Sequence, residues 1–180
     1  TLHDSPRPET PAMNPLRWSY RSTYLGGFVV CAALLGYALF SEIHLGLVPC
    51  PLCVFQRIAF IAMGIFFLIG GLHAPAGRAR WLYAGLVVLA CAWGIAVASR
   101  QLWLQSLPPD QVPSCGPGLG YLFDTFSWLK ALKIVFAGSG ECAAVHWRFL
   151  GLTMPGWTLI WYVILGLWAL WNARVRRMRV

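Results

Sequence analysis

The feature that most constrains the fold of this chain is the spacing of its charged residues. A helix that crosses a bilayer needs about 20 apolar residues and tolerates few charges. Four stretches of this kind hold at most one charged residue each: 22–41, 53–72, 81–101 and 156–173. Only 11% of all residues are charged, whereas soluble domains average about 25%. We therefore expect an all-α membrane protein, folded as a four-helix transmembrane bundle, and exclude a soluble or disordered chain.

Basic residues set the expected orientation of this bundle. Nine arginines lie before the first span, between the second and third spans, or after the fourth span: Arg7, Arg17, Arg21, Arg78, Arg80, Arg174, Arg176, Arg177 and Arg179. Because basic residues favour the cytoplasmic side of a membrane, both termini are predicted to be cytoplasmic. Residues 1–16 are expected to form a flexible tail and 17–180 a single transmembrane domain. The net charge of +8 indicates contact with anionic lipid, and no nucleic-acid partner is expected.

The two other connections, about 42–52 and 102–155, face the opposite compartment in this topology. The cysteines that we take as candidate catalytic residues lie in these loops or at their edge: Cys50, Cys53, Cys115 and Cys142. In a bacterial cell that compartment is oxidising, so these thiols can form disulfides. Cys31 and Cys91 fall inside predicted spans, where they are expected to act as small apolar packing residues.

The first cysteine pair forms the motif Cys50-Pro51-Leu52-Cys53 at the start of the second span. Proline suits the first position of a helix, which puts Cys53 in the first turn, where helix N–H groups stabilise a thiolate. Arg57 follows one turn later, about 6 Å along the axis. A charge inside a span suggests either a functional role beside the sulfur atoms or an extended side chain that reaches the lipid headgroups.

The second cysteine pair, Cys115 and Cys142, encloses the segment 121–136, whose apolar and charged residues fall on opposite helical faces. This pattern predicts a short interfacial helix within the long loop. Glycines on both sides of the segment make the connections flexible, which suits disulfide exchange. A structural disulfide that simply staples a long loop fits the same spacing.

Two further groups of polar residues are weaker candidates. Arg100, at the outer end of the third span, is expected either to contact lipid phosphates or to line an outward-facing pocket. His44 and His146 lie near the outward cysteines, but zinc ligands normally come in closer pairs. No metal site is therefore predicted.

The motifs PCPLCVFQR at 49–57 and GSGECAAVHWRFLGLTMPGW at 138–157, in this order within four spans, resemble the DsbB family. These are disulfide-bond formation proteins of the Gram-negative inner membrane. The resemblance covers about residues 17–171. One departure is Gln101, which occupies a position that is histidine in some members. Gln101 and Arg100 are added to Cys53 and Arg57 as candidate quinone-binding residues.

The resemblance implies that the chain reoxidises the periplasmic thiol oxidase DsbA and passes two electrons to ubiquinone or menaquinone, with neither metal nor flavin. It implies that Cys115 joins DsbA in a mixed disulfide and that Cys142 is the partner of Cys115. Cys50 and Cys53 would be the pair beside the quinone, with Cys53 meeting the ring and Arg57 supporting it electrostatically.

Other functions are compatible with the same pattern. A related four-span thiol oxidoreductase would serve another DsbA-like partner. A vitamin K epoxide reductase-like protein fits less well, because its C-x-x-C motif lies late in the helical core. A protein of a different class, a non-catalytic membrane assembly factor, would use the outward cysteines only as structural disulfides.

Overall fold

The computed structural model describes residues 20–108, 110–113, 125, 127–145 and 147–175. Its long helices are α1 (Tyr20–Leu45), α2 (Pro51–His73), α3 (Ala79–Gln105) and α7 (Met154–Val175). Each contains one predicted span, and all four are long and apolar enough to cross a membrane. The short elements are α5 (Trp128–Ala137), α6 (Gly140–Ala143), β1 (Arg148–Phe149) and β2 (Leu152–Thr153). The predicted four-helix membrane fold is confirmed.

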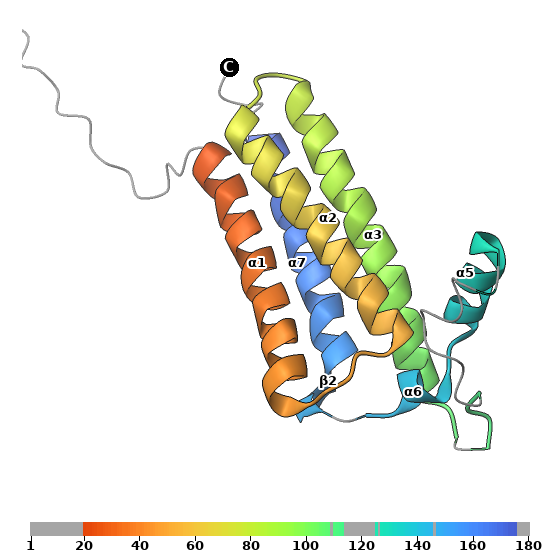
Figure 1. Ribbon diagram of the computed structural model, residues 1–180. Helices are drawn as coiled ribbons and strands as arrows, with labels where there is room; N and C mark the ends of the chain where they lie inside the picture. Colours follow the sequence, from red (N-terminus) through yellow and green to blue (C-terminus); the bar gives the residue numbers. More distant parts are fainter. Residues whose placement is uncertain (1–19, 109, 114–124, 126, 146, 176–180) are drawn as a thin grey trace, which may run out of the picture.

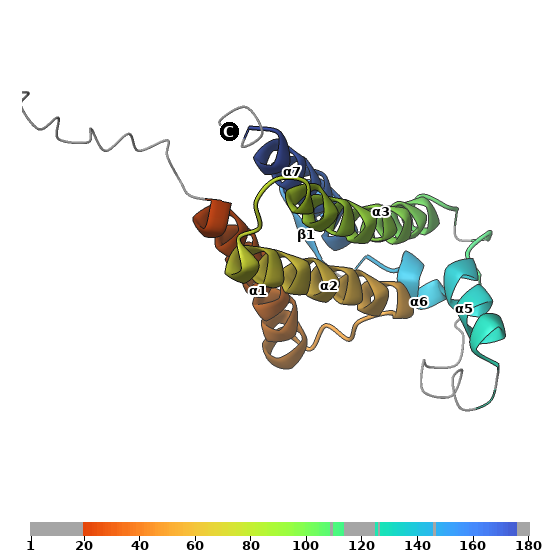
Figure 2. The same ribbon diagram turned by 90° about the horizontal axis from the view of Figure 1, so that it is seen from above.

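The long helices form an up-and-down bundle (Figure 1). Helix α1 packs along α2, α2 along α3 and α3 along α7, whereas α1 and α7 make few contacts. The start of α1, the α2–α3 turn and the end of α7 lie at one end of the bundle (Figure 1). The loop from α1 to α2 and the segment between α3 and α7 lie at the other end, which we call the cysteine end. Helix α5 extends sideways from this end, next to α6 (Figure 2).

The bundle core is built from large side chains that fit against small ones. Tyr24, Met63, Phe67, Val87 and Tyr162 are completely buried. Since lipid is as apolar as leucine, helices in a membrane associate through close packing, which small residues allow. The opposite face of α2 carries isoleucines that are about half exposed, as expected for a surface in contact with lipid: Ile58, Ile61, Ile65 and Ile69.

The ends of α2 follow from local chemistry. Cys50 is the N-cap residue, and its carbonyl accepts the first helical hydrogen bond from Val54 N–H at 3.2 Å. Pro51 occupies the first helical position, where a missing N–H costs nothing. The helix ends at His73, and the C-cap residue Ala74 has left-handed backbone angles, with its N–H bonded to Gly70 O at 3.0 Å. These ends leave Cys50 at the mouth of the bundle and Cys53 in the first turn.

Two features of the long loop differ in detail from the sequence expectation. The interfacial helix was predicted over 121–136; α5 covers Trp128–Ala137, and residues 121–124 and 126 lie outside the described part of the chain. The β1–β2 hairpin was not predicted. Its strands are two residues long, and its turn needs positive φ at Leu150 (49°) and Gly151 (81°), the geometry of a tight hairpin turn.

Replacing Gly94 by alanine tests the packing of α3 against α7. A Cβ atom at Gly94 would collide with the Tyr162 ring, whereas one at Gly85 on the same helix meets nothing within 4 Å. Overpacking of a core costs about 1–3 kcal/mol, so Gly94→Ala is expected to lower the free energy of unfolding by that amount in detergent. Gly85→Ala is the matched control, and equal stability of the two variants would contradict the packing argument.

Candidate redox site

Three of the four predicted catalytic cysteines meet at the cysteine end of the bundle. The Cys50 thiol donates to Cys53 Sγ at 3.1 Å, and the sulfur of Cys142 packs in the same cluster, within reach of the same thiol proton. Cys142 is completely buried and Cys50 is 7% exposed. Cys115 lies outside the described residues. Residues far apart in the sequence are thus brought into one sulfur cluster, with Cys50 between the other two.

Cys142 reaches Cys50 because the chain turns sharply after α5. Gly138 adopts a φ of 86°, which favours glycine, and Ser139 then begins the single turn of α6. The Cys142 N–H bonds to Ser139 O at 2.9 Å. Apolar side chains from α2, α3 and α5 enclose the cysteines: Leu52, Phe55, Val97, Leu104 and Val135.

The sulfur of Cys142 is set up as a thiolate. The hydrogen bond from Cys50, helped by the Leu52 and Ser139 N–H groups, lowers the pKa of Cys142 to about 6, against the opposing effect of burial. The same hydrogen bond raises the pKa of Cys50, which keeps its proton. Since a thiolate is the species that attacks a disulfide, Cys142 is placed as a nucleophile directly beside Cys50.

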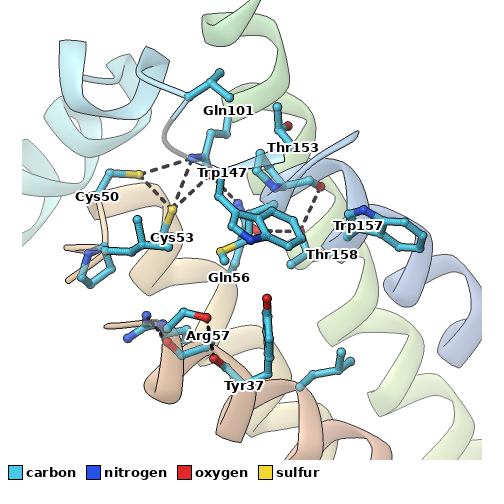
Figure 3. Close-up of a pocket in the computed structure, with 18 of the residues that line it drawn as sticks. Tyr37, Cys50, Cys53, Gln56, Arg57, Gln101, Trp147, Thr153, Trp157 and Thr158 are labelled. Carbon is cyan, nitrogen blue, oxygen red and sulfur yellow. Dashed lines mark hydrogen bonds between the residues drawn. The ribbon is translucent and has the colours of Figure 1, made fainter. Parts of the chain in front are cut away.

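A chain of amide groups holds a hydrogen-bond donor against the first cysteine pair (Figure 3). Gln101 Nε2 lies 3.3 Å from Cys53 Sγ and 3.4 Å from Cys50 Sγ. Gln101 Oε1 accepts from Gln56 Nε2 at 2.7 Å, and Gln56 Oε1 accepts from the Thr158 hydroxyl at 2.7 Å. Each amide oxygen therefore has a donor, and the Gln101 NH₂ group faces the sulfurs. Gln101 Oε1 also lies 3.6 Å from Cys53 Sγ, and the Thr158 hydroxyl lies 3.0 Å from Pro155 O.

Sequence reasoning missed Gln56 and Thr158, although a usable signal exists. A polar residue within an apolar span normally faces the bundle interior and has a partner there. Gln56 and Gln101 are 4% and 3% exposed. The sequence could have indicated that both amides face inward, but not that they bond to each other.

A cavity of about 440 Å³ opens beside this site. Its walls come from all four long helices and the hairpin, and most of them are apolar. Large aromatic side chains line it: Tyr37, Phe60, Trp147, Phe149, Trp157 and Trp161. Cys50, Cys53, Gln56, Arg57 and Gln101 are among the residues that supply its sulfur and polar atoms (Figure 3). This size and lining are typical of a small-molecule site.

Arg57 lines the same cavity but has a partner that the sequence did not reveal. Its guanidinium forms an ion pair with Glu42 of α1 and donates to Ala38 O at 3.3 Å. This pairing explains how a charge is accommodated one turn inside α2. The Arg57 side chain keeps 21% of its surface exposed, so it remains accessible at the cavity wall.

Arg100 lies elsewhere. Arg100 is not among the described residues that form the wall of this cavity, and its contact with lipid phosphates stays a prediction. Its Nε and Nη2 atoms instead donate to Phe136 O at 3.0 Å and Ala137 O at 2.9 Å, at the end of α5. Cys31 and Cys91 are buried in the bundle core, where packing was expected.

The comparison with known proteins identifies the family. The family model described as "Disulfide bond formation protein DsbB" matches residues 20–172. The chain belongs to the DsbB family. A relative named "Disulfide bond formation protein B" from Xanthomonas axonopodis pv. citri is 48% identical over 93% of this chain and 99% of its own length. Relatives with the same name from Acinetobacter baylyi and Nitrosococcus oceani are 48% and 46% identical, over 87% of this chain and 92% and 93% of their own lengths. Membership assigns this DsbB chain to disulfide bond formation.

The pH dependence of Cys142 provides a test of the sulfur contact. In the reduced protein, the thiolate absorbance that disappears in Cys142→Ser is expected to titrate near pH 6. Cys50→Ala removes the donor, so the midpoint moves up toward the ordinary thiol value of about 8.5 and the thiolate fraction at neutral pH falls. Cys31→Ala, in the separate core, serves as control. An unchanged midpoint in Cys50→Ala would rule out the contact.

Variants of two threonines, Thr158 and Thr153, test the hydrogen-bonded chain of Thr158, Gln56 and Gln101. Thr158→Val removes the donor to Gln56 and frees Gln101 to turn away from the reduced sulfurs. The Cys50–Cys53 reduction potential is then expected to become about 10–30 mV more negative, since one hydrogen bond is worth about 0.5–1.5 kcal/mol. Glutathione buffers measure this potential in a Cys115→Ser/Cys142→Ser background.

The matched control is Thr153→Val, because Thr153 also lines the cavity but donates to Gln105 Oε1 at 2.9 Å, outside the chain. Thr158→Ser keeps the hydroxyl and should retain the potential. Equal shifts in Thr153→Val and Thr158→Val would show that the chain does not orient Gln101.

Proposed function

We propose that this DsbB chain reoxidises a DsbA-like thiol oxidase of the periplasm and passes the two electrons to a membrane quinone. The observation that carries this proposal is the contact of Cys50 with both Cys53 and Cys142 at the wall of an apolar cavity. A structural disulfide requires neither a third sulfur in contact nor a cavity beside it. The alternative of a non-catalytic assembly factor is therefore less well supported.

The proposed exchange begins at the second cysteine pair. A thiolate of the reduced partner attacks Cys115 of the Cys115–Cys142 disulfide, and Cys142 leaves as a thiolate. The Cys142 thiolate attacks Cys50 of the Cys50–Cys53 disulfide, and Cys53 leaves in turn. The Leu52 and Ser139 N–H groups support this step, because they still lower the pKa of Cys142 when Cys50 is part of a disulfide and has no proton to donate.

Two further exchanges return the second pair to its oxidised state. The other thiol of the partner attacks the mixed disulfide, so that the partner leaves oxidised and Cys115 becomes a thiolate. Cys115 then attacks Cys142 in the Cys50–Cys142 disulfide. The products are a Cys115–Cys142 disulfide and a reduced Cys50–Cys53 pair, and two electrons have moved from the partner to the cavity wall.

The described residues fit a quinone at this wall. The cavity is apolar enough for a lipid-soluble ring, and α2 and α3 bring Arg57 and Gln101 to its wall beside Cys53. Arg57 would hold a ring oxygen with its charge, while Gln101 keeps a donor on the sulfur that faces the ring. A bound quinone supplies an acceptor for two electrons and two protons, and both ubiquinone and menaquinone meet this requirement.

The orientation of the bundle is part of the proposal. Arg78, Arg80 and Arg174 lie at the end opposite the cysteines, and basic residues favour the cytoplasmic side. We therefore assign the chain to the inner membrane of a Gram-negative cell, with the cysteine end in the periplasm. A DsbA-type partner has a potential near −120 mV, so a more oxidising acceptor is required, and a quinone supplies it.

The decisive experiment follows quinone absorbance in nanodiscs that contain this chain, a reduced DsbA-like protein and short-chain ubiquinone. The unsubstituted chain is expected to consume quinone in a 1:1 ratio to partner disulfide formed, because both reactions involve two electrons. Cys53→Ser and Cys142→Ser should each abolish the reaction, whereas Cys31→Ser should leave it unchanged. Quinone consumption that persists in Cys53→Ser would overturn the proposal.

A further inference from the structure

We propose that Arg100 is a positioning residue for the exchange between Cys142 and Cys50, because it fastens the end of α5 to α3 and so holds the Cys142 segment in place. This inference rests on the proposed exchange between these two cysteines. Sequence reasoning placed Arg100 among the quinone-binding candidates, and its contacts assign it to a different task.

The contacts of Arg100 are specific to the end of a helix. The last carbonyl groups of a helix have no partner within it, and they form the negative end of its dipole. Arg100 donates from two nitrogens to two consecutive carbonyls there, those of Phe136 and Ala137, at 3.0 and 2.9 Å. Its guanidinium also lies 4.2 Å from the Trp103 ring centroid, one turn further along α3. This ring restricts the guanidinium and directs its donors at α5.

Close packing at the next residue makes this docking sensitive to small changes. Gly138 follows Ala137 directly, and a Cβ atom at Gly138 would collide with the buried Leu104 side chain of α3. Phe136 contacts Trp93 and Phe55, with ring centroids 5.4 and 6.3 Å apart. The end of α5 is thus held on α3 by polar and apolar contacts together, five residues before Cys142.

Arg100 and Gln101 are neighbours on α3 with different partners. Arg100 bonds to the end of α5, and Gln101 bonds to the sulfurs of Cys50 and Cys53. Successive residues of an α-helix point about 100° apart, so one turn of α3 contacts both cysteine-bearing segments. Fixing the Cys142 segment to α3 raises the effective concentration of Cys142 at Cys50, as any tether does for an intramolecular reaction.

The test measures this effective concentration without quinone or partner. In a Cys115→Ser background, one disulfide can exchange internally: the Cys142 thiolate attacks Cys50, and Cys53 leaves as a thiolate, with no net oxidation. Peptide mapping after acid quenching gives the ratio of Cys50–Cys142 to Cys50–Cys53. Arg100→Ala is expected to lower this ratio at least tenfold, and Arg100→Lys, which keeps one donor, should give an intermediate ratio.

Lys133→Ala is the matched control, because Lys133 is an exposed cation on α5 itself and its loss should change the ratio less than twofold. Gly138→Ala disturbs the packing of the end of α5 against α3, so it should lower the ratio too. The double variant Arg100→Ala/Gly138→Ala should have a ratio only slightly below that of either single variant, because both changes affect the same contact. An unchanged ratio in Arg100→Ala, or an equal fall in Lys133→Ala, would overturn the inference. Because the ratio does not depend on quinone, it separates this inference from the wider proposal.

Discussion

The scarcity of hydrogen-bonding partners inside a membrane shapes this whole site. A polar group in hydrocarbon must find its partner within the protein, and the bundle meets this need by linking helices to one another. Gln56, Gln101 and Thr158 join α2, α3 and α7, while Arg57 and Glu42 join α2 to α1. The bonds that satisfy buried polar groups are therefore also the bonds that build the wall around Cys53.

The cluster of Cys50, Cys53 and Cys142 lies between the loop segment of the cysteine end and the apolar cavity of the bundle. Cys142 is carried by the loop segment between α3 and α7, whereas Cys53 is part of a spanning helix and faces the cavity. Cys50, the N-cap residue of α2, contacts both. In the proposed function, the water-soluble donor and the lipid-soluble acceptor need never meet, because Cys50 lies between the cysteine that serves each of them.

The sequence predicts the helices well because their signals are local. Charge-free stretches define the spans, and Pro51 defines the start of α2. The contacts that complete the site are not local: Arg57 pairs with Glu42 15 positions away, and Thr158 bonds to Gln56 102 positions away. No periodicity encodes such pairs. Arg100 illustrates the limit most clearly, since its position at a span end suggests lipid or a pocket, and only the path of α5 reveals its carbonyl partners.

The amide side chain of Gln101 affects how this part of the site responds to the surrounding pH. A histidine beside the sulfurs would change its charge near neutral pH, whereas a carboxamide neither gains nor loses a proton there. The local field that Gln101 contributes is therefore the same in acidic and neutral media. A change in external acidity therefore leaves the charge of this amide unaltered, and any response of the site to acidity arises from its ionisable groups.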